Sequence, residues 1–183
     1  MRKARLSMAA TISIAAVAAC SSSSGGSSGT ASVTGTIQGA AVPSSDAVGL
    51  SSVASGGSEA AVGAIITNIA GACGVLQSHG NPPSATALIV AVTAMGGAVA
   101  TGTYGVVAQG FGASASYATD DMSCNTSFSE GASAGSVTLT VVSGSTVAGT
   151  FDLTFGSDHL TGSFSAPVCS YTTADGGATT ACQ

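Results

Sequence analysis

The stretch SVTLTVVSGSTVAGTFDLTFGSDHLTGSFSAPV, residues 136–168, decides the fold class. Over residues 136–142, valine and leucine alternate with serine and threonine, which is the period-two pattern of a strand with one buried face. The same alternation returns over residues 147–155 and 160–166. Because only short, polar, glycine-containing turns separate these runs, the pattern predicts three consecutive antiparallel strands.

Further strands are expected upstream. Residues 88–93 are continuously apolar and predict a strand buried on both faces. One short helix is expected over residues 69–77. Dense Gly, Ser and Thr with roughly nine short strands predict an all-β fold, either an antiparallel β-sandwich or a small β-barrel. The other upstream strands are expected at residues 33–37, 47–54, 62–67, 103–108 and 113–119.

Composition excludes several classes of function. The chain has 183 residues, of which 45% are hydrophobic and only 6% charged. All of its basic residues, Arg2, Lys3 and Arg5, lie at the extreme N-terminus, so removing that segment changes the net charge from -5 to -8. Without Lys or Arg, the rest of the chain cannot neutralise nucleic-acid phosphates, form a lysine Schiff base or build a P-loop.

The N-terminus has the features of an export signal. Residues 1–5 are positively charged, and residues 6–19 form an uncharged apolar run that is short for a membrane span. The run ends in Val17-Ala18-Ala19-Cys20, which resembles the lipobox of bacterial lipoproteins. The resemblance implies that residues 1–19 are cleaved off and that acyl chains on Cys20 attach the protein to a membrane. An ordinary signal peptide cut near Ala18 is the alternative.

The expected organisation is a signal peptide, a tether and one domain. Residues 20–31 combine the lipidated Cys20 with a flexible Ser/Gly-rich tether, and residues 32–183 form a single β domain. Ser21 resembles the pattern that directs Gram-negative lipoproteins to the outer membrane. Residues 135–169 are similar to uncharacterised predicted envelope lipoproteins of Gram-negative bacteria. That similarity implies an envelope location and a β fold, and it transfers no catalytic residue.

A transmembrane hairpin is the competing interpretation of two uncharged segments, residues 60–76 and 85–100. Both are shorter than the roughly 20 residues that a spanning helix needs. Neither is flanked by the Lys or Arg that would set its orientation. We therefore favour strands in this part of the chain.

Four cysteines follow Cys20, and an even number in an exported chain predicts two disulfides with three possible pairings. Zinc binding is disfavoured because no C-x-x-C spacing occurs. Cys169 and Cys182 bracket a glycine-rich segment, so we expect them to pair and to leave Cys73 to pair with Cys124.

One string matches a catalytic motif. Gly131-Ala-Ser133-Ala-Gly135 spells the G-x-S-x-G nucleophile elbow, and an Asp (152 or 158) and His159 follow in the order seen in α/β-hydrolases. The elbow requires a strand before the serine and a helix after it, whereas a strand is predicted at residues 136–142. We therefore expect Ser133 to be unactivated.

Metal and cofactor sites are not expected. Asp120, Asp121 and Asn125 could supply oxygen ligands to calcium, but they lack the spacing of an EF-hand loop. His79 and His159 stand in predicted turns and are typical of surface residues there. No motif indicates a cofactor.

The sequence thus predicts a lipid-anchored cell-envelope protein, of the outer membrane, with a structural or binding role and no enzymatic activity. Two alternatives remain open. A serine hydrolase using Ser133 and His159 requires a hydrogen bond between the two side chains. A calycin-like carrier of an apolar ligand requires an internal cavity.

Overall fold

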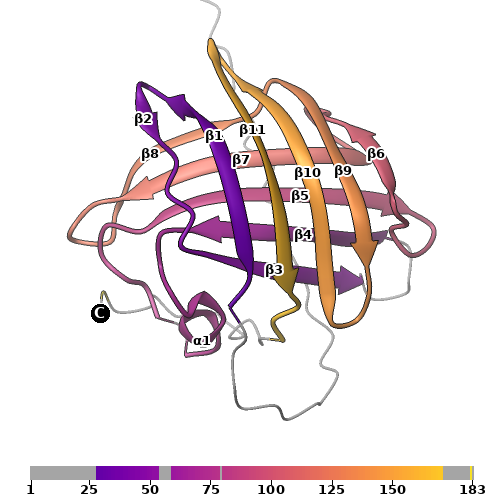
Figure 1. The fold of residues 1–183 in the computed structure, drawn as a ribbon, viewed down its shortest axis with the longest axis horizontal. Coiled ribbons are helices and arrows are strands. Elements are labelled where there is room, and N and C mark those ends of the chain that lie inside the picture. Colours follow the sequence, from indigo (N-terminus) through magenta and orange to yellow (C-terminus); the bar gives the residue numbers. More distant parts are fainter. Residues whose placement is uncertain (1–27, 54–58, 79, 171–181, 183) are drawn as a thin grey trace, which may run out of the picture.

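The computed structural model describes residues 28–53, 59–78, 80–170 and 182. In these ranges the chain forms eleven strands and one short helix, arranged as two antiparallel sheets that pack face to face. The strands of one sheet run across those of the other, as Figure 1 shows. The predicted all-β class is confirmed, and the two-sheet arrangement is the sandwich rather than the barrel.

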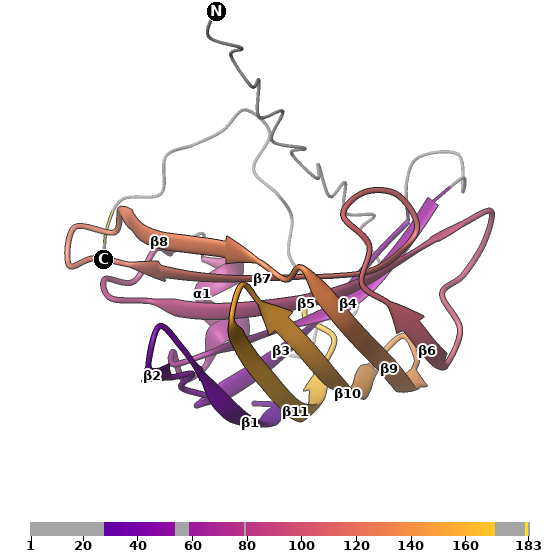
Figure 2. The same ribbon diagram turned by 90° about the horizontal axis from the view of Figure 1, so that it is seen from above.

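One sheet has six strands and the other has five, and Figure 2 shows them as separate layers. The six-stranded sheet has the order β2 (Ala40–Ala41), β1 (Thr30–Ile37), β11 (Asp158–Pro167), β10 (Thr146–Phe155), β9 (Ala134–Val142) and β6 (Gly102–Gly105). The five-stranded sheet has the order β3 (Asp46–Val53), β4 (Glu59–Thr67), β5 (Thr86–Met95), β7 (Gly112–Asp120) and β8 (Thr126–Gly131).

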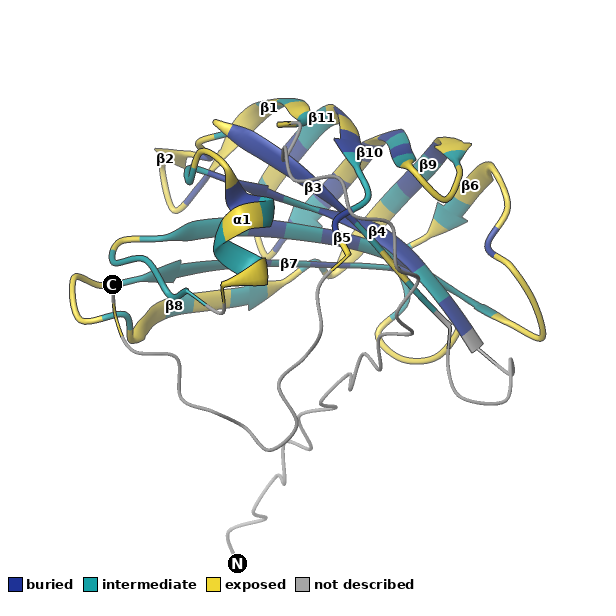
Figure 3. Ribbon diagram, turned by 90° about the horizontal axis from the view of Figure 1, so that it is seen from below, coloured by how far each residue is buried: buried dark blue, intermediate teal, exposed yellow. Residues whose placement is uncertain are grey.

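The three strands predicted from residues 136–168 are confirmed as β9, β10 and β11, which pair in succession. Phe151 of β10 lies opposite Val137 of β9 and Gly162 of β11. A two-residue turn joins β10 to β11, and its Gly156 has φ 57°, in the left-handed region that favours glycine. Figure 3 shows buried and exposed residues alternating along these strands, as period-two patterning requires.

The core lies between the two sheets and is one continuous cluster. Its largest fully buried side chains come from both layers: Ile37, Ile66, Leu88, Leu139, Leu153, Phe155 and Leu160. Strand β1 begins at Thr30, inside the stretch expected as tether.

The prediction that residues 88–93 are buried on both faces needs correction, whereas the strands favoured over a transmembrane hairpin are confirmed. Burial along β5 alternates, with Leu88 and Val90 fully buried and Ile89 between them half-buried. The strand is not buried on both faces, because only one side of an antiparallel sheet packs on this core. The segments weighed as a transmembrane hairpin contain β4 and β5, which are neighbours in the five-stranded sheet. Within the described ranges, no helix has the length and apolarity to cross a membrane.

Strand β8 and the two-residue strand β2 were not predicted, and β6 is shorter than expected. The sequence of β8, TSFSEG, has a single large apolar residue, Phe128, whose ring centroid lies 6.1 Å from that of Tyr117. Because β8 is an edge strand with most residues exposed, it lacks the alternation that marks a strand in sequence.

The predicted helix over residues 69–77 is confirmed in its second part as α1 (Ala72–Gln77). It starts late because Gly71 precedes it in the left-handed conformation, at φ 68°. Helix α1 covers the outer side of the β3 edge, where Ala72 packs with Val48 and Cys169 in a second small cluster.

Candidate functional site

Ser133 lies in the short connection between β8 and β9 and is exposed. Its Oγ donates a hydrogen bond to the carbonyl oxygen of Thr154 at 3.2 Å, and its backbone N–H donates to the same oxygen at 2.8 Å. A strand precedes Ser133 and a strand follows it, so the strand–helix context of a nucleophile elbow is absent at this position. The Ser133 hydroxyl is therefore hydrogen-bonded to the backbone of β10.

His159 pairs with Asp152 on the outer face of the six-stranded sheet, with 2.9 Å between Nε2 and Oδ1. Both side chains are largely exposed, at 57% and 62%. Among the described residues, no hydrogen bond joins Ser133 to His159. A Ser–His–Asp triad needs an imidazole nitrogen to accept the serine proton. In this structure the Ser133 hydroxyl donates its proton to the backbone carbonyl oxygen of Thr154 instead.

Of the two acidic residues considered for calcium, Asp120 ends β7 and Asp121 holds the turn that follows. Oδ1 of Asp121 accepts the backbone N–H of Ser123 at 2.8 Å and that of Asn125 at 3.0 Å. These donors, Asn125 first, hold the pKa of Asp121 below its ordinary value. Among the residues that the structure places, no group of three or more His, Cys, Asp or Glu side chains could hold a metal ion. His79 lies outside those residues.

The structure contains two disulfides, as predicted, but the expected pairing is wrong. Cys73 bonds to Cys169 and Cys124 bonds to Cys182, each pair with its Cα atoms 5.6 Å apart. Cys169 leaves β11 beside β3, where its N–H donates to the carbonyl of Gly49 at 2.9 Å, and this position faces α1. Sequence proximity suggested Cys182 as its partner, whereas the fold brings Cys73 of α1 next to it.

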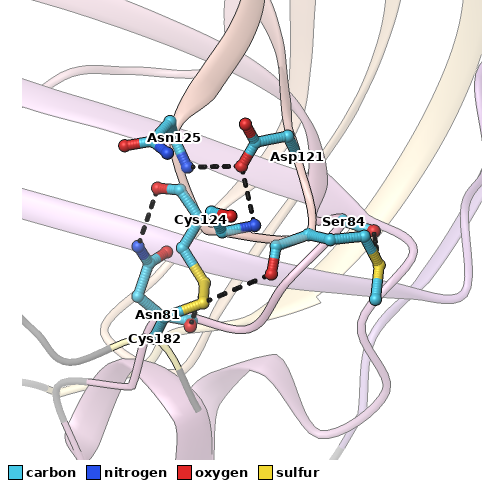
Figure 4. The surroundings of a disulfide bond; sticks show 8 residues. Asn81, Ser84, Asp121, Cys124, Asn125 and Cys182 are labelled. Carbon is cyan, nitrogen blue, oxygen red and sulfur yellow. Dashed lines mark hydrogen bonds between the residues drawn. A yellow bond between two sulfur atoms is a disulfide. The ribbon is translucent and has the colours of Figure 1, made fainter.

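The second disulfide joins the β7–β8 turn to the C-terminal end of the chain (Figure 4). Cys182 forms an isolated bridge with Asn81, and the Asn81 side-chain amide donates to the carbonyl of Cys124 at 3.3 Å. Cys124 has φ 58°, in the left-handed region. Three segments far apart in sequence therefore meet at this bond.

Sequence reasoning missed Asp46, a buried carboxylate that is only 2% exposed. Its Oδ1 accepts the N–H of Gly29 at 2.9 Å and of Ala47 at 2.7 Å, and its Oδ2 accepts the N–H of Ala72 at 3.0 Å. The residue thereby joins the start of β1, the start of β3 and the first turn of α1. An acidic residue at the beginning of a predicted strand was the only available signal.

The outer face of the six-stranded sheet is covered by hydroxyl side chains. Cross-strand partners on this face form a row of serines and threonines over five strands: Ser32, Ser163, Thr150, Thr138 and Thr103. The Oγ1 atoms of Thr103 and Thr138 are 2.8 Å apart and share a hydrogen bond. This row is a regular polar surface without charge, and the exposed Asp152–His159 pair lies on the same face of the sheet.

Comparisons with known proteins found no relative of this chain. No family model matches the chain, and no curated protein or solved structure shows significant similarity to it.

Proposed function

We propose that this protein is a lipid-anchored component of the bacterial cell envelope, attached to the outer membrane through acyl chains on Cys20. The pairing of the cysteines is the observation that carries the proposal. The two disulfides use all four cysteines downstream of the lipobox-like motif, so Cys20 takes part in neither. Disulfides also persist mainly in oxidising compartments, which favours an exported protein.

Acyl chains are the most economical means of attachment. Each buried CH₂ group of an acyl chain contributes about 0.8 kcal/mol, and stable anchoring needs more than one chain. Apart from Arg2, Lys3 and Arg5, the sequence has no Lys or Arg with which to bind anionic lipid headgroups. A diacylglyceryl group together with an N-acyl chain on Cys20 supplies that affinity.

We further propose that the anchored domain has a structural or binding role. Its sheet face, with a row of hydroxyl side chains, offers a polar contact surface, and no Lys or Arg follows Arg5 to bind nucleic acid. A continuous cluster that includes Phe151, Phe155 and Phe164 occupies the interior between the sheets, which disfavours a calycin-like carrier. The hydrogen bond from Ser133 to Thr154 disfavours a hydrolase.

The test is the intact mass of the protein purified from membranes of a Gram-negative host. The expected species begins at Cys20 and carries three acyl chains, and Cys20→Ala abolishes both the lipid and the cleavage. Ser21→Ala is the matched control and keeps lipidation. An unmodified Cys20, or a mature chain beginning elsewhere, would contradict the proposal. Fractionation alone is insufficient, because an uncleaved signal segment also holds a protein at the membrane.

The same preparation tests the absence of hydrolase activity. A fluorophosphonate probe should leave the folded protein unlabelled, because the Ser133 hydroxyl donates to the carbonyl oxygen of Thr154. Labelling that both Ser133→Ala and His159→Ala abolish would establish the serine hydrolase in place of a binding role.

A further inference from the structure

The two disulfides lie in very different surroundings. Cys169 is 6% exposed and packs with Val48 and Ala72, beneath α1. In the other bond, Cys182 is exposed and Cys124 is half-buried, at a turn on the edge of the five-stranded sheet. Cys73 is half-buried, as Cys124 is, so the two bonds differ in the exposure of the other cysteine, which is buried at Cys169 and exposed at Cys182.

Thiol–disulfide exchange requires a thiolate to reach one sulfur while the other sulfur leaves. Cys182 is the more exposed residue of the pair, so its Sγ is the expected target, and Sγ of Cys124 is then the leaving group. Sγ of Cys124 lies 3.0 Å from the carbonyl oxygen of Asn81 (Figure 4). This sulfur has no proton in the disulfide, but after reduction its S–H can donate to that carbonyl. The surroundings thus accommodate the reduced form.

We propose that the Cys124–Cys182 bond is a redox-sensitive clasp, which a dithiol reductant opens while Cys73–Cys169 and the sandwich stay intact. One thiolate of the dithiol attacks Sγ of Cys182, the S–S bond breaks, and Cys124 leaves as a thiolate that takes up a proton. The second thiol of the reductant then displaces Cys182 from the mixed disulfide, and Cys182 is protonated in turn. Two electrons pass from the dithiol, which ends as a disulfide.

Opening this clasp has a local consequence. The backbone pairing of β7 with β8 does not involve either sulfur, so the sheet persists without the bond. Only the link between the β7–β8 turn and Cys182 is lost. The inference does not depend on lipid attachment, and it applies equally to the protein with or without acyl chains.

The experiment treats the oxidised full-length protein with increasing dithiothreitol, quenches with acid and alkylates the free thiols. Trypsin cannot map the products, because no Lys or Arg follows Arg5, so a protease that cleaves at Asp and Glu is used. We expect Cys124 and Cys182 to be alkylated about tenfold faster than Cys73 and Cys169. Simultaneous opening, or earlier opening of Cys73–Cys169, would overturn the proposal.

A matched variant tests whether the Cys73–Cys169 bond is reduced slowly because of its own burial or because the other disulfide is intact. In the protein carrying Cys124→Ser and Cys182→Ser, the remaining Cys73–Cys169 bond should keep its slow rate of reduction. A rate that rises to that of the wild-type Cys124–Cys182 bond would also overturn the proposal. If this variant does not fold, the order of alkylation in the wild-type protein still decides the question.

Discussion

At the scale of single residues, Asp46 has a structural role that the sequence did not predict. Three backbone N–H groups from three separate elements converge on its two carboxylate oxygens. Such donors would be left without partners in a buried position if the carboxylate were removed, and each unsatisfied buried group costs about 1–3 kcal/mol. Asp46 therefore fixes where the chain enters the domain and where α1 begins.

Asp46→Asn should lower the free energy of unfolding by about 1–3 kcal/mol, because the amide nitrogen would face a backbone donor in place of an acceptor. Urea unfolding at neutral pH measures the change. Asp152→Asn is the control, since the exposed pair with His159 should contribute less than about 1 kcal/mol. Equal losses in the two variants would contradict the role assigned to Asp46.

At the scale of elements, β10 and β11 are joined by reciprocal glycine–phenylalanine pairs. Phe151 lies opposite Gly162, and Gly149 lies opposite Phe164. A Cβ atom at Gly162 would overlap the ring of Phe151 and the carbonyl oxygen of Ser32. Gly162 thus leaves room for the ring of Phe151 across the hairpin, whereas a Cβ atom at Gly149 would overlap the carbonyl oxygen of Thr138 on β9.

Gly162→Ala should lower the free energy of unfolding by about 1–3 kcal/mol, the usual effect of overpacking a core. Thermal unfolding followed by circular dichroism gives the value. Gly144→Ala in the β9–β10 turn is the matched control, because a Cβ atom there meets nothing within 4 Å. A Gly162→Ala protein as stable as the Gly144→Ala protein would show that the ring moves aside at no cost.

At the scale of the whole molecule, the two disulfides reinforce different parts of the sandwich. Cys73–Cys169 closes a separation of 96 residues and holds α1 against the edge where β11 approaches β3. Cys124–Cys182 closes 58 residues at the periphery. The chain-entropy model favours the longer loop only slightly, so the burial of Cys169 should determine the difference in stability.

Replacing Cys73 and Cys169 together by serine should lower the free energy of unfolding by about 2–5 kcal/mol, since cross-link and packing are lost together. Replacing Cys124 and Cys182 in the same way should cost less. Urea unfolding of both variants gives the comparison. A larger loss at the exposed bond would show that the periphery, and not the buried edge, controls the stability of the domain.

The sequence by itself determined the all-β class, most strand positions and the presence of two disulfides. The alternation over residues 136–166 is a local property, because successive side chains of a strand point to opposite faces. The four cysteines that follow Cys20 predict two bonded pairs from their number alone, without any knowledge of the fold.

Only the tertiary structure decided which residues meet. The pairing of Cys73 with Cys169, the contacts of Asp46 and the partner of Ser133 each join segments from different strands or layers. Edge strand β8 also escaped prediction, because its partner β7 rather than its own pattern holds it in place. These contacts depend on how two sheets stack and where their edges meet, and spacing along the chain does not contain that information.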